Sequence, residues 1–202
     1  MSLARIAVLV SGGGTNLQAL INAQKKGIIT SGKIELVISN KVGAYALTRA
    51  EKAGIKTATV TKKQSGSFEA FEANIKALLK EHNIDLIILA GFMSILSEDF
   101  TSTYKNRIIN VHPSLIPSFC GKDFYGLRVH QAALDYGVKV TGATVHFVNE
   151  IPDGGEIIMQ KAVAIREDDT PETLQKRVMK LAEWKILPLS AEKICKEIIK
   201  EK

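Results

Sequence analysis

The chain has 202 residues, of which 46% are hydrophobic, and a formal net charge of +6. This length and composition fit one globular domain with a substantial core, and no apolar run is long enough to cross a membrane. The two cysteines, Cys120 and Cys195, are too far apart for a metal-binding spacing or a disulfide framework. The lysines are scattered, which favours solvated helix faces over a nucleic-acid surface.

The first half of the chain alternates short apolar segments with longer amphipathic ones. We predict strands over residues 5–10, 34–39, 57–60, 86–89 and 108–111, and helices over residues 17–26, 44–53 and 68–82. Strands that are apolar on both sides and separated by helices are typical of a parallel sheet covered on both faces. The prediction is an open, doubly wound, mostly parallel α/β sheet of Rossmann-like type, whose ligands bind beyond the carboxyl ends of the strands.

The second half of the chain changes character. Two longer β-branched strands are predicted over residues 139–147 and 157–165, and the turn Pro152-Asp153-Gly154-Gly155 between them indicates an antiparallel extension of the sheet. A long helix is predicted from Pro171, with Thr170 as its N-cap, and Pro188 is expected to kink or interrupt it. Since no repeat, linker or low-complexity segment appears, residues 1–202 are predicted to form one domain.

A glycine-rich loop, Ser11-Gly12-Gly13-Gly14-Thr15-Asn16, follows the first predicted strand and precedes a helix. Glycines let a backbone approach a ligand closely, and a helix N-terminus offers free N–H groups to an anion. The loop lacks the Gly-Lys-Ser/Thr of a P-loop, and Leu17 stands where a dinucleotide fingerprint has its third glycine. The loop therefore predicts a monophosphate site. The alternative is a turn in which Thr15 or Asn16 only caps the helix.

Asn110 and His112 lie two residues apart near the carboxyl end of a predicted strand, so their side chains point the same way. This position makes the pair a candidate catalytic site, beside the alternative of a structural histidine. Asp153 is most simply a turn residue, and only a fold hypothesis brings it to His112, whose pKa a nearby carboxylate would raise. The four histidines are too dispersed to predict a metal site, although His146 could support the catalytic pair.

Five motifs occur in order along the chain. They are Ser11-Gly12-Gly13-Gly14-Thr15-Asn16-Leu17, Ala90-Gly91-Phe92-Met93, Asn110-Val111-His112-Pro113-Ser114-Leu115-Ile116-Pro117, Val145-His146-Phe147-Val148 and Asp153-Gly154-Gly155. Together they resemble the phosphoribosylglycinamide formyltransferase family of folate-dependent formyltransferases. Each motif is modest alone, but five in this order are highly specific.

The resemblance implies a reaction with two substrates and no metal. Family members transfer the formyl group of 10-formyltetrahydrofolate to the amine of glycinamide ribonucleotide in purine biosynthesis. Asn110, His112 and Asp153 match the catalytic residues of the family. Asn110 and a protonated His112 would donate hydrogen bonds to the formyl oxygen, while Asp153 would keep His112 charged and position a water for proton transfer.

The same resemblance implies two binding sites. The ribonucleotide would be held by Gly14, Thr15, Asn16 and Glu183. The folate would be held by Met93, Ser94, Ile95 and Leu96, by Asn110, and by Asn149, Glu150, Ile151, Pro152 and Asp153. The sequence departs from the family at Phe68, where an arginine that contacts the folate is common, at Ser94, which can be arginine, and at Trp184, where histidine is common. The CGKDFY segment also makes a longer loop than some members have.

Related formyl enzymes are the nearest alternatives. Methionyl-tRNA formyltransferases share the Asn-x-His-Pro-Ser-Leu segment but carry a further C-terminal domain, and formyltetrahydrofolate deformylases usually carry a further N-terminal one; the length of this chain favours neither. A non-catalytic phosphate- or nucleotide-binding module would need the glycine loop without the catalytic residues. We expect a cytoplasmic enzyme of the monofunctional bacterial type, monomeric or weakly dimeric, with small-molecule substrates and no nucleic-acid or membrane partner.

Overall fold

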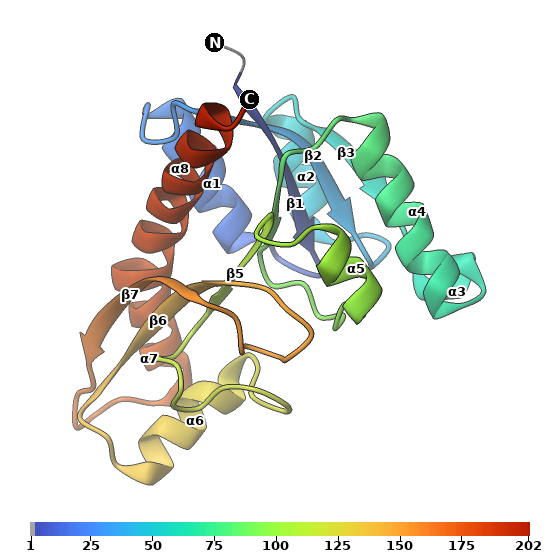
Figure 1. Cartoon of the computed structure of the whole chain (residues 1–202). Helices are drawn as coiled ribbons and strands as arrows, with labels where there is room; N and C mark the ends of the chain where they lie inside the picture. Colours follow the sequence, from blue (N-terminus) through green and yellow to red (C-terminus); the bar gives the residue numbers. More distant parts are fainter. Residues whose placement is uncertain (1–2) are drawn as a thin grey trace.

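A computed structural model describes residues 3–202 and contains one seven-stranded sheet in the order β3-β2-β1-β4-β5-β6-β7 (Figure 1). The strands are β1 (Ala4–Val10), β2 (Gly32–Ser39), β3 (Lys56–Thr59), β4 (Leu86–Leu89), β5 (Ile108–His112), β6 (Val140–Phe147) and β7 (Ile157–Ala164). β1 to β5 pair in parallel, whereas β5 with β6 and β6 with β7 pair antiparallel. The predicted doubly wound sheet with an antiparallel extension is confirmed.

Helices cover both faces of this sheet (Figure 1). They are α1 (Thr15–Lys25), α2 (Tyr45–Lys52), α3 (Lys62–Ser65), α4 (Phe68–Glu81), α5 (Glu98–Thr103), α6 (Leu127–Tyr136), α7 (Pro171–Val178) and α8 (Trp184–Lys200), with a π-helical turn η1 (Met179–Glu183) between the last two. The interior strand β1 contributes to both cores: Ile6 and Val8 pack with α1, α2 and α8, while Ala7 and Leu9 pack with α4 and α5. Successive side chains of β1 point to opposite faces of the sheet, and both faces are covered by helices. This explains why β1 is continuously apolar.

Helix starts follow the side chains that cap them. The Thr170 side chain accepts the backbone N–H of Thr173 and the Thr173 side chain accepts that of Thr170, a capping box with Pro171 in the first turn, as expected for this helix start. The Ser67 side chain caps α4 in the same way by accepting the backbone N–H of Ala70. The predicted strands and the helices predicted over residues 17–26, 44–53 and 68–82 lie within two residues of the observed ones, whereas no range was predicted for α3, α5 or α6.

The expected interruption of the last helix is not at Pro188. That proline lies inside α8, and the irregular segment is the π-helical turn Met179–Glu183, which ends just before α8 begins at Trp184. A proline ring clashes with the carbonyl four residues earlier, which here is Trp184. The distortion therefore lies on the N-terminal side of the proline, one turn before it.

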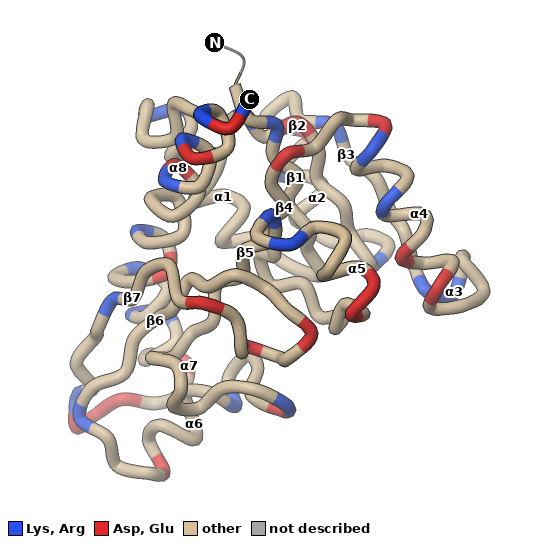
Figure 2. The backbone as a smooth tube through the Cα atoms, viewed as in Figure 1, with Lys and Arg blue, Asp and Glu red and all other residues tan. Residues whose placement is uncertain are grey.

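Charged residues are spread around the molecule. Figure 2 shows basic and acidic positions distributed over helices of both faces and along the antiparallel strands. Within residues 3–202, no helix is long and apolar enough to cross a membrane.

Candidate active site

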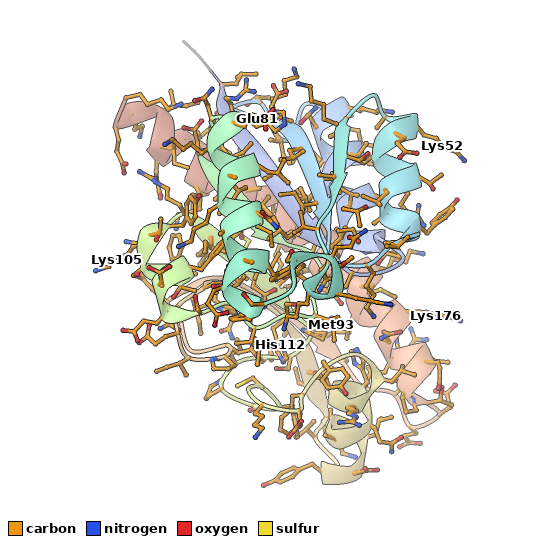
Figure 3. The ribbon with its side chains drawn as sticks, turned by 90° about the vertical axis from the view of Figure 1, so that its right-hand side faces the viewer. Lys52, Glu81, Met93, Lys105, His112 and Lys176 are labelled. Atoms are coloured by element: carbon orange, nitrogen blue, oxygen red, sulfur yellow. The ribbon has the colours of Figure 1, made fainter. Side chains whose placement is uncertain are left out.

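Three loops meet at one edge of the sheet. The glycine loop of residues 11–14 follows β1, residues 90–97 follow β4, and residues 113–126 follow β5. Because β1, β4 and β5 are adjacent and parallel, their carboxyl ends share this edge. Figure 3 places Met93 and His112 there, level with the start of α4, whereas Glu81 at the other end of α4 lies toward the opposite edge.

A chain of four polar side chains runs along this edge. His112 Nδ1 lies 3.4 Å from Asp153 Oδ2, and His146 Nε2 lies 3.5 Å from Asp153 Oδ1. The Asn110 amide nitrogen lies 3.2 Å from His146 Nε2. The structure thus brings together Asn110, His112 and Asp153, and it adds His146, which pairs with Asn110 across β5 and β6.

The turn that delivers Asp153 depends on its glycines. A Cβ on Gly155 would lie 1.8 Å from the carbonyl oxygen of Phe147, so only glycine fits where the turn passes the end of β6. Asp153 itself has a positive φ of 57°. A left-handed conformation at a non-glycine residue is uncommon and concentrates at functional sites.

The histidine beside this carboxylate is less basic than the sequence led us to expect. Burial lowers the pKa of His112, and this effect outweighs the negative charge of Asp153, which raises it. The pKa of His112 therefore lies below its ordinary value. Burial works to raise the pKa of Asp153, but His146, His112 and the Gly121 amide together bring it below its usual range. Burial and the Asp153 carboxylate thus act on the pKa of His112 in opposite directions, and the expectation of a charged His112 stays a prediction.

The loop after β5 contacts both members of this pair. His112 Nε2 lies 2.9 Å from the carbonyl oxygen of Phe119, and the Gly121 backbone N–H donates to Asp153 Oδ2 at 2.9 Å. Phe119 has a positive φ of 50°. The bond to Phe119 requires a proton on Nε2, because a carbonyl oxygen can only accept, while Nδ1 faces the Asp153 carboxylate, which also accepts.

The glycine loop packs closely against α2 and leads directly into α1. Gly14 is the N-cap of α1 at a φ of 72°, and a Cβ there would lie 2.6 Å from Ala46 Cβ. Ala46 N–H donates to the Gly12 carbonyl and Arg49 Nε to the Gly13 carbonyl, so both carbonyls are held toward α2. No side chain caps α1, so the alternative in which Thr15 or Asn16 caps this helix is wrong. The first N–H groups of α1 are left to bind an anion.

Asn16 instead reaches the far end of the chain. Its amide nitrogen donates to Glu183 Oε2 at 2.7 Å, across 167 positions of sequence. Burial raises the pKa of Glu183 to about 7, against the opposing hydrogen bond from Asn16. The end of the glycine loop and Glu183, both predicted to hold the ribonucleotide, therefore lie in contact.

The two segments predicted to line a folate pocket present apolar side chains to solvent. Met93 is 52% exposed, Ile95 66% and Ile151 57%. Leu96, in contrast, is buried in the core with α4 and α5, so its side chain does not line a pocket and only its backbone can face a ligand. In the second segment, Asn149 Oδ1 accepts the backbone N–H of Ile151 at 3.0 Å and shapes the turn. Glu150 and Pro152 are exposed beside it.

A cation lies where Phe68 replaces the arginine common in the family. The Lys62 ammonium sits 4.6 Å from the centre of the Phe68 ring and 5.9 Å from that of Phe71. This cation–π contact fixes the lysine at the start of α4. No sequence pattern pointed to this lysine, because α3, which carries Lys62, was not predicted. Among residues 3–202, no group of three or more His, Cys, Asp or Glu side chains is arranged to hold a metal ion.

Comparison with known proteins identifies the family. A family model described as formyl transferase matches residues 4–190. A phosphoribosylglycinamide formyltransferase of Haemophilus influenzae is 42% identical over 92% of this chain and 84% of its own length. The chain belongs to the phosphoribosylglycinamide formyltransferase family.

Solved structures of this family share the fold. Glycinamide ribonucleotide transformylase 1 from Symbiobacterium toebii matches with a TM-score of 0.90 and 39% identity, over 96% of this chain and 89% of that one. The trifunctional purine biosynthetic protein adenosine-3 of Gallus gallus is 48% identical over 91% of this chain, which spans only 18% of that relative. The family membership predicted from five sequence motifs is confirmed.

Proposed function

We propose that this formyltransferase moves the formyl group of 10-formyltetrahydrofolate to the amine of glycinamide ribonucleotide, giving formylglycinamide ribonucleotide and tetrahydrofolate. The observation that carries the proposal is that two groups lie along one sheet edge: the glycine loop with Glu183, and Asn110 with His112 and Asp153. It offers a phosphate cradle at one end and groups for acyl transfer at the other.

The reaction needs a hydrogen-bond donor for the carbonyl oxygen. The acceptor amine attacks the formyl carbon while negative charge builds on the oxygen, and the carbonyl then re-forms as the C–N bond to the folate breaks. Asn110 has two amide hydrogens, of which one faces His146 and the other is available for that oxygen. The Nε2–H of His112 supplies a second donor. Two such donors in a buried site stabilise the developing charge strongly.

The reaction also moves one proton from the attacking amine to the departing folate nitrogen. Asp153 is a carboxylate at neutral pH because its pKa is held below the usual range by His146, His112 and the Gly121 amide, although burial opposes them. His112 Nδ1 faces this carboxylate, so a proton that arrives on the imidazole is stabilised there. The pair can therefore take up and return the proton without a metal.

The two ends of the site hold the two substrates. The α1 N-terminus and Asn16 with Glu183 bind the ribonucleotide through its phosphate and hydroxyl groups, and Met93, Ile95 and Ile151 offer an apolar surface to the folate ring. Both substrates are small molecules. A cytoplasmic location, a monomeric or weakly dimeric state, and the absence of nucleic-acid or membrane partners stay predictions.

A three-acceptor assay tests the proposal. Formyl transfer from 10-formyltetrahydrofolate is followed with glycinamide ribonucleotide, without acceptor, and with charged initiator methionyl-tRNA. Turnover only with the ribonucleotide is expected. Tetrahydrofolate release without acceptor would indicate a deformylase, and transfer to the tRNA alone would overturn the proposal.

A further inference from the structure

Side chains in the loop of residues 92–96 alternate between at least partly buried and exposed positions. Met93 and Ile95 point outward, whereas Phe92 and Leu96 pack against the core of α4 and α5. The outward residues can face the folate only if the backbone between them is held in place. Three polar side chains from other parts of the chain supply that support.

The first support comes from the glycine loop itself. The hydroxyl oxygen of Ser11 accepts the backbone N–H of Met93 at 2.8 Å, and Ser11 is only 5% exposed. Ser11 opens the loop whose later residues are proposed to hold the acceptor phosphate. The Ser11 side chain thus joins the glycine loop of residues 11–14, here called the acceptor loop, to residues 90–97, here called the donor loop.

The second support lies one residue further along. The Asn40 amide nitrogen donates to the Ser94 hydroxyl at 2.9 Å, and the Asn40 backbone N–H donates to the Val10 carbonyl at 3.3 Å. Val10 immediately precedes Ser11. The second bond therefore ties the donor loop to the same strand end as the first.

The third support is independent of the acceptor loop. Glu72 of α4 accepts both the backbone N–H of Ser97, at 2.7 Å, and the Ser97 hydroxyl, at 2.5 Å. It fixes the far end of the donor loop from the opposite face of the sheet. The chain therefore contains two anchors, Ser11 and Asn40, that tie residues 90–97 to the acceptor side, and a third, Glu72, that holds only residues 90–97.

We infer that Ser11 is a positioning residue that couples the two substrate sites, so that acceptor bound in the glycine loop tightens the binding of folate at Met93. A ligand that fixes the acceptor loop also fixes Ser11 and, through it, the Met93 backbone, so the second ligand orders less of the protein. Thermodynamic linkage makes the effect reciprocal. The inference rests on the proposed function, since that proposal assigns the two loops to the two substrates.

Calorimetry of a non-reacting pair measures this coupling. Tetrahydrofolate has no formyl group to transfer, so its Kd is measured with and without saturating glycinamide ribonucleotide. In the wild type, the ribonucleotide should lower this Kd by about fivefold or more. Ser11→Ala should reduce that factor by about two- to tenfold, the range expected for one neutral hydrogen bond.

Ser97→Ala is the matched control, because it removes a hydroxyl from the same loop without touching the acceptor side. It should weaken tetrahydrofolate binding alone and keep the wild-type coupling factor. Asn40→Ala provides a second test and should also reduce the factor, whether or not Ser11→Ala folds. An unchanged factor in the variants that fold, or no coupling in the wild type, overturns the inference. A wild type that binds no ribonucleotide overturns the proposed function instead.

Discussion

His112 directs its Nε2 atom at the carbonyl oxygen of Phe119, 2.9 Å away. The same N–H is the donor proposed for the formyl oxygen. The Phe119 carbonyl must therefore move aside or share this hydrogen when the substrate carbonyl arrives. Because Gly121 of the same loop donates to Asp153, a movement of the loop changes the surroundings of both members of the pair.

Removal of the proposed donors should affect turnover more than binding. His112→Ala and Asn110→Ala should each lower kcat by about 100- to 1,000-fold, since each removes one hydrogen bond to the developing oxyanion. Steady-state kinetics with direct measurement of substrate Kd checks this. His82→Ala, at the C-cap of α4, serves as the control and should retain wild-type kcat. Near-normal turnover in His112→Ala would remove this residue from the mechanism.

The pH profile should report a histidine of lowered pKa. Since burial outweighs Asp153 and lowers the pKa of His112, kcat/KM for the folate at saturating ribonucleotide should be level around neutral pH and fall only on the acid side. Asp153→Asn removes the group that raises this pKa, so the acid limb should move to lower pH and the plateau should drop about 100-fold or more. An activity that falls above pH 6.5 would instead require a charged His112.

Glu183 should make both stability and acceptor binding depend on pH. Its pKa is raised by burial from 4.5 to about 7, so between these values the unfolded state loses the proton first and stability falls as pH rises. Relative to Glu183→Gln, the wild type should lose up to about 3 kcal/mol of unfolding free energy across this window. Denaturant titrations at several pH values measure this difference.

The same variant separates stability from recognition. In the wild type, the affinity for the ribonucleotide should rise with pH through about 7, because the ionised carboxylate is the better acceptor for hydroxyl groups. Glu183→Gln should bind the ribonucleotide more weakly and without this dependence. An identical pH dependence in both proteins would assign the titration to another group.

Lys62 should recognise the carboxylates of the folate tail in place of the arginine missing at Phe68. Lys62→Ala should raise KM for the folate about two- to fivefold, the size expected for an exposed ion pair, and leave kcat unchanged. Lys63→Ala, on the same turn of α3 but without a ring contact in the structure, is the matched control. A folate analogue without the glutamate tail should not distinguish the two variants.

Local sequence patterns were sufficient for most of the fold. The apolar run of β1 and the helical spacing of apolar residues in α4 follow from the burial of each segment. Both elements could therefore be predicted without knowledge of the tertiary structure. The helices α3 and α5 have only four and six residues, too few to display a helical period. The π-helical turn was not predicted as such, because Pro188 indicated a distortion of the last helix but not its type or its place one turn earlier.

Those parts of the site that lie on one strand could be predicted from the sequence, whereas contacts between different strands and loops could not. The period of a strand put Asn110 and His112 on one face, but their contacts with His146 and Asp153 arise from the pairing of β5 with β6. The direction in which the pKa of His112 shifts could not be predicted, because it depends on how deeply the side chain is buried in the folded protein. The sequence did not predict the roles of Ser11, Asn40 and Glu72. Their side chains hold the loop of residues 90–97 in place, and this role has no sequence pattern.

The π-helical turn at Met179–Glu183 also carries information about evolutionary history. Such a turn holds one residue more than a turn of α-helix, and here the helices on both sides contribute buried residues to the same core. The turn is therefore the expected trace of a single-residue insertion that the helix absorbed without displacing either flank. Relatives that lack this residue between Thr170 and Glu183 should show a continuous α-helix, and the spacing between these two positions should vary by one among them.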